Sequence, residues 1–489
     1  MLPVKHRQKV RMTDPVLLWL REDLRFDDNP AMRAAAATGQ PVACVFVLDD
    51  DTPGEMKMGG AQRWWLHHSL TAFSEDLKTR EGALILRRGD ARHIIPQLAE
   101  ELGASDVFWN RRYMRWQTEA DSDIKKELKD AGRGAESFNG RLLYEPWEIE
   151  TKSGDPYRVF TPFWKNLQAK GEVREALPRV DKLTAPSSLP SSDRLEDWDL
   201  LPTRPDWATG FAPVWSPGEK GARARLREWL KNEAARYKDT RNRPDLDETS
   251  RLSPHLHFGE ISPVTIWHDV QAGIKAGDIP ADQGHTFLSE VAWREFSYHL
   301  LYYQPQMTEE PLQEKFADFE WDTDETALTA WQKGLTGYPI VDAGMRQLWQ
   351  TGWMHNRVRM IVASFLIKDL LIHWREGMAW FWDTLVDADQ ANNTASWQWV
   401  AGCGADAAPY FRIFNPTTQG EKFDPDGDYI RKFVPELSRL PAKYIHDPSN
   451  APKDVLKEAG IRLGETYPAP IVDHKKARED ALSRYQSIK

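Results

Sequence analysis

The most constraining feature of this sequence is the alternation of short apolar runs with helix-like segments over roughly its first 110 residues. The apolar runs are residues 16–20, 41–48, 83–87 and 106–109. Strands that alternate with helices pair in parallel, because each connection must cross a face of the sheet before the chain returns. The pattern therefore predicts an α/β N-terminal domain with a doubly wound parallel sheet, which binds ligands beyond the carboxyl ends of its strands.

Several classes of protein are excluded by motifs that the sequence lacks. It contains no G-x-G-x-x-G and no G-x-x-x-x-G-K-[ST], so neither a Rossmann dinucleotide site nor a P-loop is supported. Its two cysteines cannot form a disulfide framework, and we expect a reducing, cytoplasmic location. No run of about 18 apolar residues occurs, so we expect no membrane partner.

Helix-like patterns dominate the second half of the sequence, whereas strands and helices alternate in the first part. We expect the α/β domain at residues 14–145, an interdomain linker at 146–216 and a helical domain at 217–489. Residues 183–205 are rich in Ser, Pro and Asp and show little periodicity, as is typical of a linker.

Net charge is -10, which argues against a basic coat for nucleic acid. Cations nevertheless gather between residues 223 and 243, where either a phosphate-binding patch or a solvated helix face would explain them. The 22 tryptophans exceed ordinary packing needs and suggest stacking surfaces or electron relays.

Residues 341–420 combine a helix-period apolar pattern with more polar residues than a core face needs. On a helix, Asn356 shares a face with Arg359, whereas Arg357 points away from it. A buried Arg359 needs a carboxylate, and Asp387 and Asp389 are the nearest candidates in this stretch. With the neighbouring tryptophans, these residues suit either a planar heteroaromatic ligand or an aromatic-rich core that contains a satisfied ion pair.

Two further segments suggest ligand contacts. Hydroxyl groups and an arginine that together suit a diphosphate, or ordinary helix capping, occur at Thr249, Ser250, Arg251 and Ser253. Glu290 and Trp293 lie three residues apart, so one helix face would bring a carboxyl group and an indole to the same cavity. A carboxylic acid buried beside aromatic rings has a raised pKa and can donate a hydrogen bond.

Four motifs in this half resemble the flavin-binding domain of the DNA photolyase and cryptochrome family. They are T-G-Y-P-I-V-D-A-G-M-R-Q-L, T-G-W-M-H-N-R-V-R-M, A-N-N-T-A-S-W-Q-W and D-A-A-P-Y-F-R-I-F-N-P-T-T-Q-G-E-K-F-D. The segment W-L-R-E-D-L-R-F-D-D-N-P-A after the first strand resembles the family's opening motif. The chain is most similar to bacterial cyclobutane pyrimidine dimer (CPD) photolyases of class I or III. This resemblance implies an all-α FAD-binding domain at the C-terminal end.

The resemblance also implies a reaction, the repair of cyclobutane pyrimidine dimers in ultraviolet-damaged DNA. In the family, the reduced FAD anion absorbs blue or near-ultraviolet light, passes an electron to a flipped-out dimer and regains it after the ring splits. The implied FAD contacts are Tyr237, Thr249, Ser250, Arg251, Leu252, Ser253, Arg359, Asp387, Asp389 and Asn393. Asn393 matches the residue that faces the flavin N5, where a neutral amide favours the reduced anion.

Further roles follow from the same motifs. The implied lesion and DNA contacts are Arg241, Glu290, Trp293, Asn356, Arg357, Met360, Trp399 and Arg412. Trp397, Trp374 and Trp321 match the chain that carries electrons to an oxidised flavin. No metal is expected, because the histidines form no H-E-x-x-H motif.

In the family, the first domain holds an antenna chromophore, a folate or a deazaflavin. The loop from Trp109 to Asp121 occupies the corresponding place, and its M-R-W sequence at 114–116 departs from both patterns. Methenyltetrahydrofolate is favoured over 8-hydroxy-deazaflavin, and an empty site is a further alternative. We expect the protein to act as a monomer.

Two rival functions exist within the family. A cryptochrome would act as a blue-light photoreceptor through a protein partner, but such photoreceptors commonly replace the amide of Asn393 with Asp or Cys. The short stretch after the flavin motifs also leaves no long signalling tail. Repair of the (6-4) photoproduct calls for histidines where this chain has Asn356 and Met360.

Overall fold

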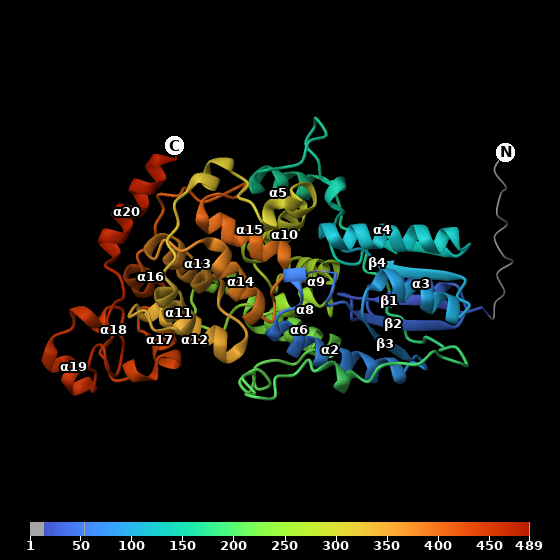
Figure 1. Ribbon diagram of the computed structural model, residues 1–489, viewed down its shortest axis with the longest axis horizontal. Helices are drawn as coiled ribbons and strands as arrows, with labels where there is room; N and C mark the ends of the chain where they lie inside the picture. Colours follow the sequence, from blue (N-terminus) through green and yellow to red (C-terminus); the bar gives the residue numbers. More distant parts are fainter. Residues whose placement is uncertain (1–13, 53, 489) are drawn as a thin grey trace.

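The computed structural model describes residues 14–52 and 54–488 and shows an α/β domain beside a larger helical domain (Figure 1). Five parallel strands form one sheet in the order β3-β2-β1-β4-β5. Their bounds are β1 (Val16–Leu20), β2 (Val42–Leu48), β3 (Leu84–Arg88), β4 (Asp106–Asn110) and β5 (Gly134–Phe138). The doubly wound parallel sheet predicted from the sequence is confirmed.

The fifth strand was not predicted. Its sequence, G-A-E-S-F, contains no apolar run, and none of its residues is fully buried. β5 pairs only with β4, at one edge of the sheet, so it never receives the two-sided burial that makes a central strand apolar.

Helices cover both faces of this sheet. Val16, Leu18 and Leu20 of β1 pack with α1 and α2, whereas Leu17 and Trp19 pack with α3 and α4. These helices are α1 (Pro30–Ala37), α2 (Gly60–Lys78), α3 (Ala91–Glu101) and α4 (Arg115–Asp130). The strand order reverses between β1 and β4, which places a ligand-binding crevice beyond the carboxyl ends of these two strands.

Helices make up most of the rest of the described chain. They are α5 (Phe160–Ala169), α6 (Glu219–Asn232), α7 (Tyr237–Thr240), α8 (Ser253–His257), α9 (Pro263–Ala276), α10 (Ala281–Tyr303), α11 (Glu325–Lys333), α12 (Pro339–Thr351), α13 (Asn356–Ser364), α14 (Trp374–Thr384), α15 (Gln390–Ala401), α16 (Pro416–Phe423), α17 (Asp428–Phe433), α18 (Ala442–Ile445), α19 (Lys453–Ala459) and α20 (His474–Ser487). A five-residue π-helix, Phe365–Asp369, follows α13. In Figure 1, α20 lies at the end of the molecule farthest from the sheet.

The two domains meet where α2 packs on α14. Gln62 Nε2 donates to Trp382 O at 3.0 Å, and Gly60 N donates to Asp383 Oδ1 at 2.8 Å. A Cβ atom at Gly59 would lie 2.3 Å from Trp382 O, so the close approach of these helices requires glycine there.

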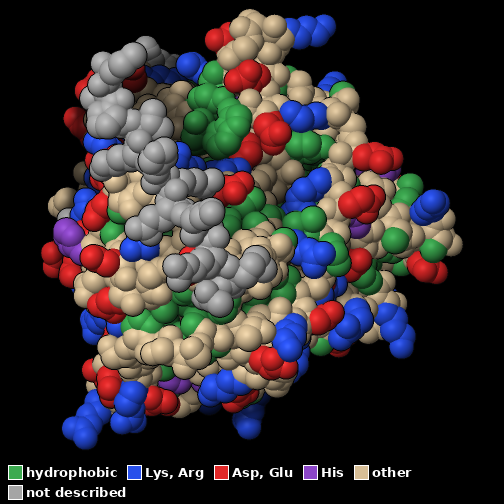
Figure 2. Space-filling model, turned by 90° about the vertical axis from the view of Figure 1, so that its right-hand side faces the viewer, with side chains coloured by type: hydrophobic (Ala, Val, Ile, Leu, Met, Phe, Trp, Pro, Cys, Tyr) green, Lys and Arg blue, Asp and Glu red, His purple; other side chains and the backbone are tan. Residues whose placement is uncertain are grey.

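Charge on the surface of the α/β domain is mixed. Basic and acidic side chains are interspersed over the face seen in Figure 2. Within residues 14–52 and 54–488, no helix has both the length and the apolar character that crossing a membrane requires.

Candidate active site

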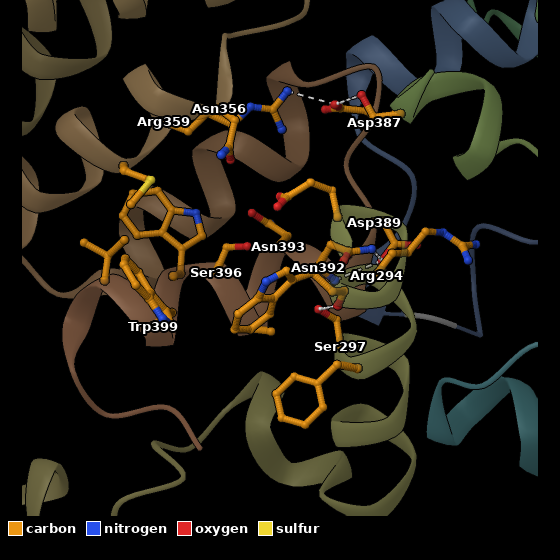
Figure 3. A pocket seen from close by; sticks show the side chains of 18 of the residues that line it. Arg294, Ser297, Asn356, Arg359, Asp387, Asp389, Asn392, Asn393, Ser396 and Trp399 are labelled. Carbon is orange, nitrogen blue, oxygen red and sulfur yellow. Dashed lines mark hydrogen bonds and ion pairs between the residues drawn. The ribbon is translucent and has the colours of Figure 1, made fainter. Parts of the chain in front are cut away.

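A cavity of about 550 Å³ lies among the helices of the second domain, and Figure 3 shows part of its lining. Its walls come from α7, α8, α10, α13 and α15, which are far apart in the sequence. The predicted site residues that line it are Tyr237, Arg241, Ser250, Leu252, Ser253, Glu290, Trp293, Asn356, Arg357, Arg359, Met360, Asp387, Asp389, Asn393, Trp397 and Trp399. The structure thus brings most of the predicted residues to one place.

An ion pair between Arg359 and Asp387 forms one wall. Arg359 Nη2 lies 2.8 Å from Asp387 Oδ2, and its Nε donates to the carbonyl of Met354 at 2.8 Å. The same carboxylate accepts a 2.6 Å bond from Ser253 Oγ at the start of α8. The Asp387 side chain is only 2% exposed, so the guanidinium and the hydroxyl stabilise a charge that burial would otherwise oppose. Of the two carboxylates considered for Arg359, Asp387 is its partner.

Asn393 projects from the first turns of α15 toward the same cavity (Figure 3). Its Nδ2 donates to Met378 O of α14 at 3.1 Å, which fixes the orientation of the amide. Asp389 caps α15 by accepting a bond from Asn392 N at 2.9 Å. The carboxylate at position 389 therefore helps to place Asn393 one turn later.

The second oxygen of Asp389 belongs to a buried network that the sequence did not reveal. Arg141 Nη2 lies 3.0 Å from Asp389 Oδ2, Tyr298 OH donates to the same oxygen, and Arg141 also pairs with Glu22. Although burial opposes ionisation, the His257 ring and Arg141 hold the pKa of Asp389 well below its usual range. Arg141 is 248 residues from Asp389, so no local pattern in the sequence could have paired them.

Glu290 differs from its predicted environment. Its side chain is 30% exposed and pairs with Arg241, so it is less buried than the acid that the sequence predicted. Beside it, the Trp293 ring stacks on Phe160 with centroids 3.7 Å apart, which fixes the indole at the cavity wall.

The two arginines of α13 have different partners, as their positions on the helix predicted. Arg357 donates to Asn242 Oδ1 at 2.8 and 3.1 Å and lies over the Phe423 ring, 4.5 Å from its centroid. It borders both the main cavity and a neighbouring one of about 500 Å³. Arg412, another predicted DNA contact, lines only the neighbouring cavity.

The predicted phosphate-binding segment has an unusual backbone. Arg251 has φ of 51°, a left-handed conformation that a residue with a Cβ adopts only at a cost of about 1–3 kcal/mol. Ser250, Leu252 and Ser253 line the cavity, whereas Thr249 and Arg251 do not. The buried Thr249 Oγ1 has no hydrogen-bond partner within the described residues.

The three predicted relay tryptophans run from the cavity toward the surface. Trp397 lines the cavity, and it packs so closely on α14 that a Cβ at Gly377 would lie 2.0 Å from its ring. Trp374 begins α14, one turn before Gly377, and is 1% exposed. The His373 ring lies between Trp374 and the partly exposed Trp321, at centroid distances of 5.4 and 5.0 Å. Trp374 and Trp321 do not line the cavity.

Seven polar lining residues were not among the predicted site residues, namely His257, Arg294, Ser297, Asn392, Ser396, Gln398 and Asp406. Ser297 lies two turns after Glu290 on α10, and Ser396 lies one turn after Asn393 on α15. Helical spacing from the predicted residues would have found these two serines, since positions at i+3 and i+7 share a face.

Comparisons with known proteins cover both domains. Residues 287–487 match the family model for the FAD binding domain of DNA photolyase, and residues 16–183 match the DNA photolyase model. The chain is 52% identical to a deoxyribodipyrimidine photo-lyase of Agrobacterium fabrum over 98% of each chain. It is 39% identical to cryptochrome-1 of Arabidopsis thaliana, over 96% of this chain and 70% of that protein.

One solved structure agrees closely with this one. The crystal structure of a bacterial class III photolyase from Agrobacterium tumefaciens matches with a TM-score of 0.95 and 52% sequence identity, over 98% of this chain and 99% of that one. Because both family models and full-length relatives match across the sheet and the helices, the chain belongs to the DNA photolyase family.

Proposed function

We propose that this protein is a deoxyribodipyrimidine photo-lyase, a carbon-carbon lyase that uses light to split cyclobutane pyrimidine dimers in DNA. The observation that carries the proposal is a single cavity with two kinds of wall. One wall has the Arg359–Asp387 pair and Asn393, and the other has Trp293 and Trp399. The first suits a polar heteroaromatic cofactor, and the second suits bases removed from the stack.

The residues present fit FAD. Ser250, Leu252 and Ser253 line the cavity on either side of the left-handed turn at Arg251, so their hydroxyl and backbone N–H groups suit a ligand phosphate. When bound and reduced, FAD would supply the photoexcited electron that the amino acids themselves cannot provide. The chain would hold it through Tyr237, Thr249, Ser250, Arg251, Leu252, Ser253, Arg359, Asp387, Asp389 and Asn393.

The remaining cavity residues would receive the lesion. Trp293 and Trp399 offer aromatic faces for the two pyrimidines, and Asn356 and Met360 extend the same pocket along α13. Arg241 holds the Glu290 carboxylate at the rim, where it can accept a hydrogen bond from a base edge. Arg357 and Arg412 would contact flanking phosphates.

Electrons for an oxidised cofactor would pass through Trp397, Trp374 and Trp321. The His373 ring between the last two has a pKa lowered to about 4 by burial and then by Arg375, so it stays neutral near pH 7. A neutral ring does not oppose a positive charge that moves outward along the chain.

An antenna chromophore would bind between the two domains. A second pocket lies at the strand-order reversal, beyond the ends of β1 and β4. Four buried N–H groups of its lining residues have no hydrogen-bond partner among residues 14–52 and 54–488, namely Trp19 Nε1, Arg21 Nε, Arg112 Nε and Trp116 Nε1. Buried donors need acceptors, so these groups suit a ring rich in carbonyl and nitrogen acceptors, which a folate and a deazaflavin both provide. Of the two, we propose methenyltetrahydrofolate over 8-hydroxy-deazaflavin.

We also propose a cytoplasmic monomer with domain limits at residues 14–145, 146–216 and 217–489. These limits agree with the positions of the elements, because β5 ends at Phe138 and α6 begins at Glu219.

The test is repair itself. The purified protein should show flavin absorption, and blue light should split thymine dimers in an oligonucleotide when the flavin is reduced. Glu290→Ala should lower the repair yield while FAD stays bound. A protein that binds FAD and undergoes photoreduction but leaves the dimers joined would instead support a cryptochrome-type photoreceptor.

The antenna has a separate test. Added methenyltetrahydrofolate should give a near-ultraviolet band that remains after gel filtration and excites flavin-dependent repair. Trp116→Phe, which removes one unpartnered donor, should weaken retention of the folate without affecting retention of FAD. Equal folate retention by both proteins would argue against this pocket.

A further inference from the structure

A loop at the edge of the lesion pocket exposes two side chains of opposite character. This rim loop, residues 402–415, joins α15 to α16. Its first part lines the main cavity through Gly404 and Asp406, and Arg412 lines the neighbouring cavity. Phe411 is 63% exposed, and no large hydrophobic side chain among the described residues is more exposed. An exposed apolar ring is unfavourable in water, and together with an adjacent guanidinium it suits contact with a nucleic acid.

Tyr410, the residue before Phe411, anchors the rim loop in the core. Tyr410 is 1% exposed, and its ring stacks on Tyr485 of α20, with centroids 4.7 Å apart and an interplanar angle of 19°. The rings of Phe316 and Phe319 also pack on Tyr410, with centroid distances of 5.8 and 5.4 Å. The rim loop is therefore held from behind by the C-terminal helix.

A buried lysine provides a second attachment. Lys368 lies in the π-helix, is 1% exposed, and donates from Nζ to the carbonyl of Arg412 at 3.0 Å. Its ammonium also lies 5.1 Å from the centroid of the Tyr410 ring. Burial lowers the pKa of Lys368 to about 7 although the adjacent Asp369 opposes this change. An apolar residue at position 368 would pack at lower cost than a buried lysine. In addition, π-helical turns are frequent at functional sites.

The C-terminal helix is tied to the same turn. His474, the first residue of α20, pairs with Asp369 of the π-helix at 2.5 Å. At the other end of α20, Arg484 pairs with Asp322 at 2.8 Å. These two contacts hold α20 in the position that lets Tyr485 stack on Tyr410.

We infer that Lys368, Tyr410 and Tyr485 are positioning residues for DNA binding, which set the rim loop so that Phe411 and Arg412 face the damaged strand. The inference rests on the proposed function, because it takes DNA as the ligand of this face. It assigns the C-terminal helix a role in substrate affinity, although no part of α20 lines either cavity. If these contacts served stability alone, weakening them would lower the melting temperature and leave DNA affinity unchanged.

The experiment measures the dissociation constant of the FAD-loaded protein for a short duplex that contains one thymine dimer, by fluorescence anisotropy. Lys368→Met and Tyr485→Ala should each raise it about five- to twentyfold. Flavin absorption and repair per absorbed photon at saturating DNA should not change, since neither residue touches the cavity. Tyr485→Phe keeps the stacked ring and should restore wild-type affinity. Lys476→Met removes an exposed charge from the same helix and should bind like the wild type.

A double-mutant cycle separates this inference from the proposed function. In the Phe411→Ala, Arg412→Ala background, Lys368→Met should raise the dissociation constant less than twofold, because the side chains that it positions are gone. If Lys368→Met raises the dissociation constant by the same factor in this background as in the wild type, the positioning role is wrong. Unchanged affinity in both Lys368→Met and Tyr485→Ala would also overturn it. If Phe411→Ala, Arg412→Ala itself binds as tightly as the wild type, the DNA face of the proposed function is wrong.

Discussion

Among single residues, Asp387 and Asp389 show how far ion pairs can be predicted from the sequence. Both were candidates for Arg359, because a buried guanidinium needs a carboxylate. In the structure, Arg359 pairs with Asp387, whereas Asp389 pairs with Arg141. Arg141 comes from the loop after β5, so the second pair exists only once the two domains have met.

Asp387→Asn should weaken FAD binding by about tenfold to a hundredfold. The change leaves Arg359 without an anionic partner beside the cavity, and hydrogen bonds to charged groups contribute about 1.5–3 kcal/mol. FAD retention is measured by fluorescence titration of the apoprotein. The expected loss is smaller than for a fully buried pair because the Arg359 side chain is 24% exposed.

Glu465→Gln is a matched control for that change. Glu465 pairs with Arg462 at 2.8 Å, but both side chains are more than 60% exposed, so water replaces the lost interaction. FAD affinity should equal that of the wild type. Equal losses in both variants would mean that overall charge, and not the Arg359 pair, controls FAD binding.

At the scale of the element, α13 depends on an uncommon cap. His355 precedes this helix, is 2% exposed and accepts a bond from Arg357 N on its Nδ1 at 3.2 Å. The sequence could not reveal this role, because Ser, Thr, Asp and Asn are the usual capping residues. Burial, followed by Arg357 and the neighbouring arginines, lowers the pKa of His355 to about 3. The cap therefore needs the neutral ring.

His355→Asn should make the protein less sensitive to acid. The pKa of His355 is near 6.5 when unfolded and about 3 when folded, so the neutral ring stabilises the fold above pH 6.5 and this contribution is lost as pH falls. From pH 7 to pH 5, the wild type should lose about 2 kcal/mol of unfolding free energy that the variant, which keeps a capping oxygen, does not lose. Thermal unfolding midpoints at the two pH values measure the difference.

His93→Asn provides the comparison for this prediction. The His93 side chain is 85% exposed, so its replacement should leave the change in unfolding midpoint between pH 7 and pH 5 as in the wild type. If His355→Asn shows the same pH dependence as the wild type, the buried cap does not control acid sensitivity.

For the whole molecule, the sequence predicted the sheet and the flavin-type motifs but not the contacts between the two domains. Each central strand is apolar because both of its faces are covered, so the strands could be identified one by one. The second pocket and the Arg141 network instead join residues from both domains. Contacts between distant segments leave no periodic signal in the sequence, so only the three-dimensional structure shows them.

Charge at this scale gives a last prediction. The protein carries -10 overall, yet Arg241, Arg357 and Arg412 border the cavities that would face DNA. Each phosphate contact contributes about -0.9 to the slope of log K against log salt concentration. Arg241 is already paired with Glu290, which reduces its contribution, so the slope should lie between about -2 and -3. Arg412→Ala should make it less steep by about 0.9, as measured by anisotropy from 50 to 200 mM salt. An affinity indifferent to salt would mean that base stacking in the pocket, and not phosphate contact at its rim, holds the DNA.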